Sequence, residues 1–313
     1  MRTLPAAPVF TKTEAAALGW TTDALRHAVR TGAVVRLRRG VYTSVERPGP
    51  VEHAIAAAKA HPGAVVSHRS AALLLGLPLV GPRPEFPELT VQPREPANTH
   101  QVRSFRATLR PEDVVSVRAV AATSPARTLV DVARHGPLTT AVALGDAALH
   151  AGTTADEVDD VLRFCWSWPR IRRAQRAARL LDPLAESPLE SLSRLVLRSP
   201  AVPRPVTQQV ICTRSGRFVA RTDFYWDEPG VVGEADGASK YESLAVLLSE
   251  KRRQEQLESL GLIVVRWGWS DVRQRPRDLI RRIEAALERG RHRSRSGFPR
   301  EWALGGSLSA HAV

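Results

Sequence analysis

The chain has 313 residues, and its 45 lysines and arginines against 32 acidic residues give a formal net charge of +13. With 43% hydrophobic and 25% charged residues, the composition is that of a soluble globular protein and excludes a disordered or fibrous one. No apolar run approaches the roughly 20 residues of a membrane helix, and the start lacks the apolar core of a signal peptide. We therefore expect a cytoplasmic protein without a membrane partner.

The positive excess is almost entirely arginine, which pairs bidentately with phosphates and guanine edges. A GC-rich genome would explain the preference for arginine over lysine, but not the surplus of arginine over acids. That surplus favours a polyanionic partner, namely nucleic acid. Two cysteines, Cys165 and Cys212, are too few for a disulfide framework or a cysteine-rich zinc site.

The first 45 residues predict two short helices and a basic hairpin. Thr11 and Glu14 have capping-box spacing at the start of the first helix. Thr21 or Thr22 caps the second helix, and glycines follow both helices. A strand-like run at 33–37, a turn at 38–40 and a return strand from Val41 complete the segment. This order predicts a winged helix-turn-helix.

Basic residues point away from the apolar face of the second helix and cluster on the hairpin. A recognition helix places such residues against bases and phosphates, and a wing adds backbone contacts. The alternative is a solvated helix face beside a basic turn. The predicted DNA-binding residues are Arg26, His27, Arg30, Arg36, Arg38 and Arg39.

The stretches FTKTEAAALGW, RLRRGVYTS and VVSHRSAALLLGLPL resemble the N-terminal region of AbiEi-type antitoxins, over about the first 80 residues. These are winged-helix regulators of type IV toxin–antitoxin systems. The resemblance implies DNA binding and transcriptional autoregulation. It also implies a cognate nucleotidyltransferase toxin as a protein partner.

The middle segment, 81–184, reads as α/β. It begins with a proline-rich stretch, continues with strand-like alternation at 100–120, and contains a helix capped by Ser124 with Pro125 at its first position. Arg127, Asp131 and His135 recur at intervals of four, which predicts a surface salt-bridge ladder. Five arginines at 170–179, near Trp166 and Trp168, indicate either a helix face that follows phosphates or a solvated helix with tryptophans in the core.

The segment 185–290 predicts the order α-β-β-β-α-β-α. Its first helix is capped by Ser187, with Glu190 at the capping-box position, and strands follow at 206–212, 217–226 and 230–235. A long helix at 242–260, a strand at 263–267 and a helix at 276–288 complete it.

Carboxylates lie at notable places in these strands. Asp223 lies on the second strand, whereas Glu234 and Asp236 lie two residues apart on the third and share a face. Buried acids are costly unless they bind a cation, and carboxylates from adjacent strands suit Mg²⁺. The ion would polarise a phosphodiester and activate water. The alternative is a half-exposed strand with solvated acids and a simple Asp236–Gly237 turn.

The stretches RTDFYW, VVGEADGASKY, EKRRQEQLESLGL and VVRWGWSDV resemble the PD-(D/E)xK nuclease superfamily, in a group similar to very-short-patch-repair endonucleases. The resemblance implies a restriction-endonuclease-like αβββαβ domain with Mg²⁺ or Mn²⁺ bound by Asp223 and Glu234, and it matches Glu190 to a nearby acid. The lysine expected two residues after Glu234 is replaced by Asp236. Lys240 or Lys251 would supply the missing cation, and Asp236 would add a ligand or orient water.

The sequence thus predicts an α/β (α+β) protein of four segments: 1–80, 81–184, 185–290 and a disordered basic tail at 291–313. The first hypothesis is a DNA-binding, metal-dependent endonuclease. The second is an AbiEi-like regulator with a catalytically inactive nuclease-like domain, and the third is a scaffold that binds no nucleic acid. The sequence leaves open whether the site cuts, whether the substrate is DNA or RNA, and the oligomeric state.

Overall fold

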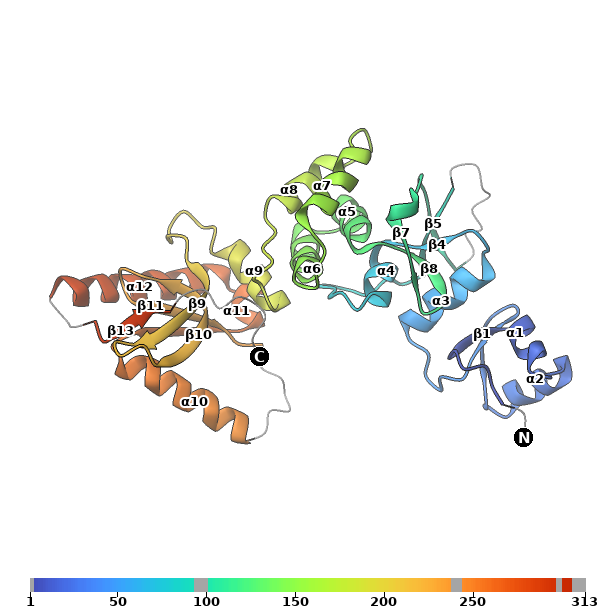
Figure 1. Cartoon of the computed structure of the whole chain (residues 1–313), viewed down its shortest axis with the longest axis horizontal. Helices are drawn as coiled ribbons and strands as arrows, with labels where there is room; N and C mark the ends of the chain where they lie inside the picture. The colour runs from blue at the N-terminus through green and yellow to red at the C-terminus, as the bar shows by residue number, and fades with distance from the viewer. Residues whose placement is uncertain (1–2, 93–100, 238–243, 297–299, 306–313) are drawn as a thin grey trace. The chain divides into compact units, whose positions relative to one another are not determined.

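The computed structural model describes residues 3–92, 101–237, 244–296 and 300–305. The chain divides between Leu181 and Asp182 into two compact units, here called unit 1 (1–181) and unit 2 (182–313). Both contain helices packed on sheets, which confirms the mixed α/β class (Figure 1). The division lies close to the boundary predicted at residue 185. The other predicted boundaries stay predictions, except the one after residue 80, which is discussed with the second sheet.

Unit 1 begins with a helix pair and a three-stranded antiparallel sheet of order β1-β3-β2. Thr11 caps α1 in a capping box with Glu14, and Thr21 caps α2, as predicted. The short strand β1 was not predicted. The elements are β1 (Val9–Thr11), α1 (Lys12–Ala17), α2 (Thr22–Arg30), β2 (Val35–Arg38) and β3 (Val41–Thr43).

A second sheet of five strands follows, in the order β6-β5-β4-β8-β7. Its elements are α3 (Pro50–Ala60), β4 (Val65–Val66), α4 (His68–Leu74), β5 (Glu88–Val91), β6 (Arg103–Arg106), the 3₁₀ turn η1 (Pro111–Asp113), β7 (Val114–Val117) and β8 (Val120–Thr123). Because β4 pairs with β5 and β8, the predicted boundary after residue 80 cuts through this sheet and is wrong.

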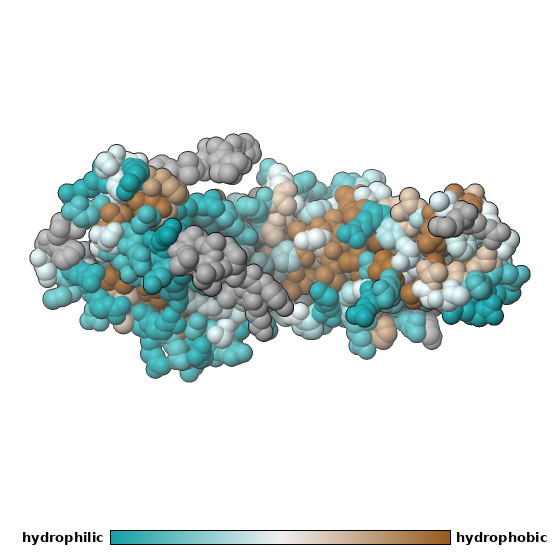
Figure 2. All heavy atoms as spheres, turned by 90° about the horizontal axis from the view of Figure 1, so that it is seen from below, coloured by the Kyte–Doolittle hydropathy of each residue, from teal (hydrophilic) through white to brown (hydrophobic). Residues whose placement is uncertain are grey.

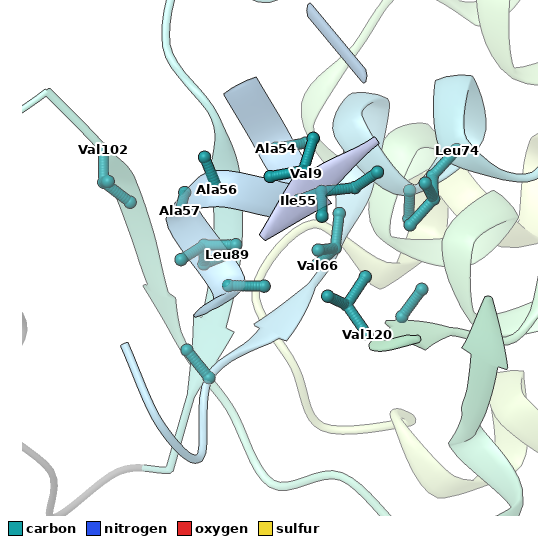
Figure 3. Close-up of a cluster of buried hydrophobic side chains, with 14 of the residues drawn as sticks. Val9, Ala54, Ile55, Ala56, Ala57, Val66, Leu74, Leu89, Val102 and Val120 are labelled. Carbon is teal, nitrogen blue, oxygen red and sulfur yellow. The ribbon is translucent and has the colours of Figure 1, made fainter. Parts of the chain in front are cut away.

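Helix α3 joins the two sheets of unit 1 through one hydrophobic cluster. Its alanines and Ile55 pack with Val9 of β1 on one side and with Val66, Leu89 and Val120 of the second sheet on the other (Figure 3). Small alanine side chains let the helix approach both sheets closely. The N-terminal sheet therefore shares its core with the rest of unit 1.

Four helices complete unit 1: α5 (Pro125–His135), α6 (Leu138–His150), α7 (Ala155–Phe164) and α8 (Ile171–Ala178). Ser124 caps α5, as predicted. The predicted surface ladder is wrong, because Arg127 and Asp131 are fully buried. They do form the expected pair, Nε to Oδ2 at 2.9 Å, but Arg127 also pairs with Asp113 of η1 at 3.0 Å. Because both side chains are shielded from water, a second carboxylate helps to compensate the buried charge of Arg127.

The basic helix α8 buries Ile171, Ala174 and Ala177 and exposes its arginines. The two tryptophans near it differ. Trp166 is 73% exposed, whereas the ring of Trp168 lies under the guanidinium groups of Arg127 and Arg134, at 4.6 and 4.9 Å. Trp168 thus covers the buried charges, and Trp166 faces solvent.

Unit 2 carries the predicted order of elements, with one extra helix and one extra strand. They are α9 (Pro188–Val196), β9 (Val206–Thr213), β10 (Phe218–Trp226), β11 (Val231–Ala235), α10 (Leu244–Ser259), β12 (Ile263–Trp267), α11 (Trp269–Arg273), α12 (Pro276–Arg295) and β13 (Trp302–Leu304). The sheet has the order β12-β11-β10-β9-β13, with β11 and β12 parallel and the other pairs antiparallel.

Helices cover both faces of this sheet, with α10 along one side and α12 along the other (Figure 1). Leu257 of α10 packs with Tyr225 and Val232 of the sheet. Gly233 of β11 leaves room for the Trp267 ring, because a Cβ at this position would lie only 2.4 Å from that ring. This close approach lets the indole of Trp267 donate to the Ser193 hydroxyl of α9, at 2.7 Å.

The prediction of a disordered tail from residue 291 is wrong for the described residues. Helix α12 continues to Arg295, and β13 pairs with β9. Trp302 helps to hold β13 on the sheet, because its indole donates to the Tyr225 hydroxyl at 2.6 Å. The face of the molecule drawn in Figure 2 is mainly hydrophilic. Among the described residues, no helix has the length and apolar character needed to cross a membrane.

Candidate functional site

Two acids of unit 2 face each other across neighbouring strands. Phe224 of β10 pairs with Gly233 of β11, and the same antiparallel register sets Asp223 opposite Glu234. Directly opposed residues share a face, with Cβ atoms roughly 5 Å apart. We call Asp223 and Glu234 the carboxylate pair.

Asp223 is fixed by the backbone of the opposite strand. Its Oδ2 accepts the Ala235 N–H at 2.7 Å. Burial raises the pKa of Asp223 to about 6, the hydrogen bond from Ala235 acts against this shift, and the nearby Glu190 carboxylate adds to it. The side chain therefore loses its proton as the pH approaches neutrality, and a nearby cation would favour the ionised form further.

Glu234 is more deeply buried, with 5% of the residue exposed. Its Oε2 accepts from the Arg253 guanidinium of α10 at 2.9 Å, whereas its buried Oε1 has no hydrogen-bond partner among the described residues. Burial and then the charge of Asp223 raise the pKa of Glu234 to about 7, against the attraction of Arg253 and Arg266. An unsatisfied buried oxygen of this kind calls for a ligand or a proton.

Glu190 comes from the first turn of α9, as its place after the Ser187 cap requires. Its Oε2 accepts from Gln208 Nε2 at 2.8 Å and from the Glu186 N–H at 3.1 Å. These two donors hold the buried carboxylate near enough to Asp223 to raise the pKa of that acid. Glu190 thus lies beside the carboxylate pair, where the sequence placed it.

Asp236 does not join the carboxylate pair. It is 40% exposed in its side chain, and its Oδ2 lies 3.1 Å from Arg266 Nε on β12. The prediction of Asp236 as a third metal ligand therefore lacks support in this geometry: among the described residues, no group of three or more His, Cys, Asp or Glu is arranged to hold a metal ion.

Of the two predicted lysines, the structure describes only Lys251. Lys240 lies outside the described residues. The Lys251 ammonium is 74% exposed and lies 3.9 Å from Glu255 on its own helix. The cation that α10 directs at Glu234 is Arg253, so the placement of Lys251 at the site is wrong.

Arg253, Gln208 and Arg266 are the site residues that the sequence did not reveal. For Arg253 a signal existed, because it precedes the buried Leu257 by four positions and so shares its face of α10. Lys251 is two residues from Arg253 and lies on another face of the helix. For Gln208 and Arg266, only the sheet register brings them near the acids.

The carboxylate pair fits a divalent cation in part. Mg²⁺ is commonly held by one or two carboxylates with waters completing its coordination, and Oε1 of Glu234 is a buried oxygen available for such a bond. Asp223 and Glu234 would be the ligands. Arg253 on the other oxygen of Glu234 compensates part of the same charge.

A second candidate surface lies on α2 and the β2–β3 hairpin of unit 1. Helix α2 buries Leu25 and Ala28, which leaves its basic residues exposed. Arg26 pairs with Asp23 at 2.9 Å and remains 74% exposed. The other predicted contact residues that are exposed are His27, Arg30, Arg36 and Arg39.

Arg38 is not available to DNA in the way the sequence predicted. Its Nη2 donates to the backbone carbonyl of Gln101 at 2.8 Å, and its Nε is buried. Residues two apart on a regular strand share a face, but a register shift interrupts β2 between Arg36 and Arg38, so Arg38 does not follow the exposed side of Arg36.

Residues 6–45, which span β1 to β3, match the family described as "Transcriptional regulator, AbiEi antitoxin". The match ends before α3 and does not reach unit 2. The chain is also similar to two curated proteins of Mycobacterium tuberculosis, the uncharacterized protein MT2308 (strain CDC 1551 / Oshkosh) and the uncharacterized protein Rv2248 (strain ATCC 25618 / H37Rv). Each is 35% identical over 175 residues, covering 54% of this chain and 63% of the relative.

Proposed function

We propose that this chain is a DNA-binding transcriptional regulator, in which residues 6–45 act as a winged helix-turn-helix. The observation that carries the proposal is the exposed basic side of α2, opposite the buried Leu25 and Ala28. The hairpin beside it exposes Arg36 and Arg39, and the order β1-α1-α2-β2-β3 is that of a helix pair followed by a wing. The family match supports the same reading and favours a cognate toxin protein as a partner.

The test is DNA affinity as a function of salt, measured by fluorescence anisotropy on the DNA upstream of the chain's own gene. Arg26→Ala and Arg30→Ala should weaken binding, and each lost phosphate contact should reduce the salt slope by about 1. Arg163→Ala is the matched control, because Arg163 also pairs at i,i+3, with Asp160, and is 70% exposed.

Equal affinity for the wild type and both α2 variants would refute DNA recognition through this helix. Equal losses in the Arg163 variant would show that net charge alone, rather than the α2 surface, sets the affinity.

A second candidate function is favoured by Oε1 of Glu234, which has no hydrogen-bond partner in the described part of the chain: we propose phosphodiester hydrolysis at the carboxylate pair. The order α9-β9-β10-β11-α10-β12 agrees with the αβββαβ arrangement that the sequence resemblance implies. Bound Mg²⁺ or Mn²⁺ would polarise the phosphodiester and lower the pKa of an attacking water. Asp223 and Glu234 would hold the ion, and Arg253 would orient Glu234. Glu190 would add a negative charge beside the ion.

Nicking of supercoiled plasmid tests this candidate, with Mg²⁺, Mn²⁺ or EDTA. The double variant Asp223→Asn/Glu234→Gln should abolish metal-dependent nicking. The matched control is Glu255→Gln/Glu258→Gln, which also removes two acids but from the exposed side of α10. An intact plasmid, together with DNA binding that the double variant retains, would leave unit 2 as a non-catalytic module of the regulator.

A further inference from the structure

Unit 1 contains a cavity of about 360 Å³ beside the β2–β3 hairpin. Its wall is formed by Leu37 and Arg38 of β2, by the start of α3, and by the proline-rich segment 84–87. Small-molecule sites in proteins typically occupy about 300–1,000 Å³. We call this space the Arg38 cavity.

Arg38 brings a positive charge to this cavity without a counter-ion. Its guanidinium forms no ion pair within the described part of the chain, and its buried Nε has no hydrogen-bond partner there. Burial lowers the pKa of Arg38 below its usual value. A partly buried guanidinium without a counter-ion is costly, and an anion in the cavity would pair with its charge through a charge-assisted hydrogen bond.

The α3 N-terminus contributes further positive potential. The helix has 11 residues and begins at Pro50, after the Gly49 cap, and both of these residues line the cavity with His53. The positive end of the helix dipole favours an anion there, although the Glu52 carboxylate already accepts from the Gly49 N–H at 2.8 Å. Glu85, an exposed acid on the wall, disfavours a ligand with several negative charges.

The remaining wall is made of apolar rings. Pro48, Pro84 and Pro87 line it together with Phe86, a large hydrophobic residue that is 44% exposed. Rings of this kind pack well against an aromatic body, and exposed phenylalanine is stabilised when such a body covers it.

We propose that the Arg38 cavity is a binding site for a small aromatic carboxylate, whose carboxylate pairs with Arg38 and whose ring packs on Phe86 and the prolines. Since Arg38 lies between Arg36 and Arg39 on the hairpin, occupancy would restrain the wing. This assigns the regulator an effector site, which goes beyond the proposed DNA binding. The binding test below does not use DNA, so it is decided separately from the proposed function.

Isothermal titration calorimetry with cinnamate as the probe tests the site, using the full chain and cinnamamide as the uncharged control. Cinnamate should bind saturably, and loss of the charge pair should weaken binding by about tenfold or more, either in cinnamamide or in Arg38→Met. Arg39→Met is the matched control, since it removes an exposed arginine from the same hairpin and should leave cinnamate affinity unchanged.

Phe86→Ala provides a second variant whose side chain is partly exposed, and it should weaken both probes. If circular dichroism shows that Arg38→Met does not fold, cinnamate binding by Phe86→Ala tests the site instead. Absence of saturable cinnamate binding, equal affinity for cinnamamide, or equal loss in the Arg38 and Arg39 variants would each overturn the site.

Discussion

Arg127 illustrates how a single residue can depend on charges from distant parts of the sequence. Its guanidinium is 0% exposed and lies between Asp131 on its own helix and Asp113 of η1. Burial raises the pKa of Asp131, and the charge of Arg127 opposes that shift. Each acid has one further arginine, since Asp113 also pairs with Arg110 at 3.0 Å and Asp131 with Arg134 at 3.4 Å, but water is excluded from the position that Arg127 fills.

We therefore predict that Arg127→Met lowers the free energy of unfolding by about 3–5 kcal/mol, because two buried carboxylates each lose one of their cations and water cannot replace it. Arg163→Met, at an exposed i,i+3 pair, should cost about 1 kcal/mol or less. Urea denaturation of both variants provides the measurement. A loss in Arg127→Met no larger than that in Arg163→Met would contradict the role assigned to the buried cluster.

The same residue marks the limit of sequence reasoning at this scale. Spacing of four predicted the pair between Arg127 and Asp131, because helical geometry alone brings those side chains together. It could not predict burial, which depends on Asp113 and on the Trp168 ring above the guanidinium. Contacts of this kind arise from tertiary packing.

At the level of elements, local signals predicted most helices and the longer strands. Capping residues such as Thr11, Ser124 and Ser187 accept from the helix N–H groups as their positions required. The strands β1 and β13 were missed because each has three residues, and each is stabilised mainly by its partner strand. A short segment without its partner carries little strand signal.

The candidate metal site also combines residues that the sequence predicted with one that it did not. The sequence predicted Asp223 and Glu234, because acids on adjacent strands are conspicuous, and the resemblance to nucleases added Glu190 on the preceding helix. It predicted the wrong cation on α10, since three consecutive basic residues leave the rotation of the helix undecided until Leu257 is known to be buried. The structure selects Arg253, whose guanidinium contacts Glu234.

At the scale of the whole molecule, buried histidines should set much of the response to acid. Burial, followed by the charges of His135 and several arginines, holds the pKa of His68 well below 6.5, and burial lowers the pKa of His135 to about 4. Both histidines are neutral in the fold at pH values where an unfolded histidine is protonated.

We predict that the stability contributed by these two histidines falls as the pH decreases from 6.5 towards about 4, since the unfolded chain then binds more protons at their side chains than the native one. The slope contributed by His68 approaches about 1.4 kcal/mol per pH unit. In urea titrations across this range, His68→Asn should flatten the dependence, and asparagine tolerates the φ of +51° found there.

His27→Gln, at an exposed position, is the matched control and should leave the slope unchanged. The raised pKa values of Asp223 and Glu234 act in the opposite direction, because the native chain keeps their protons longer than the unfolded chain, and the stability that this contributes is lost as the pH rises from their ordinary pKa values to about 6 and 7. An unaltered slope in His68→Asn would contradict the prediction.

Strand β13 has a consequence for association between copies of the chain. It occupies the outer side of β9, and Trp302 anchors it on Tyr225. Without it, β9 would present a row of open backbone N–H and C=O groups, which readily accept a strand from another molecule. Cleavage before residue 300 would therefore replace a three-residue edge strand by the eight residues of β9, and this longer open edge would favour domain swapping and aggregation in concentrated solution.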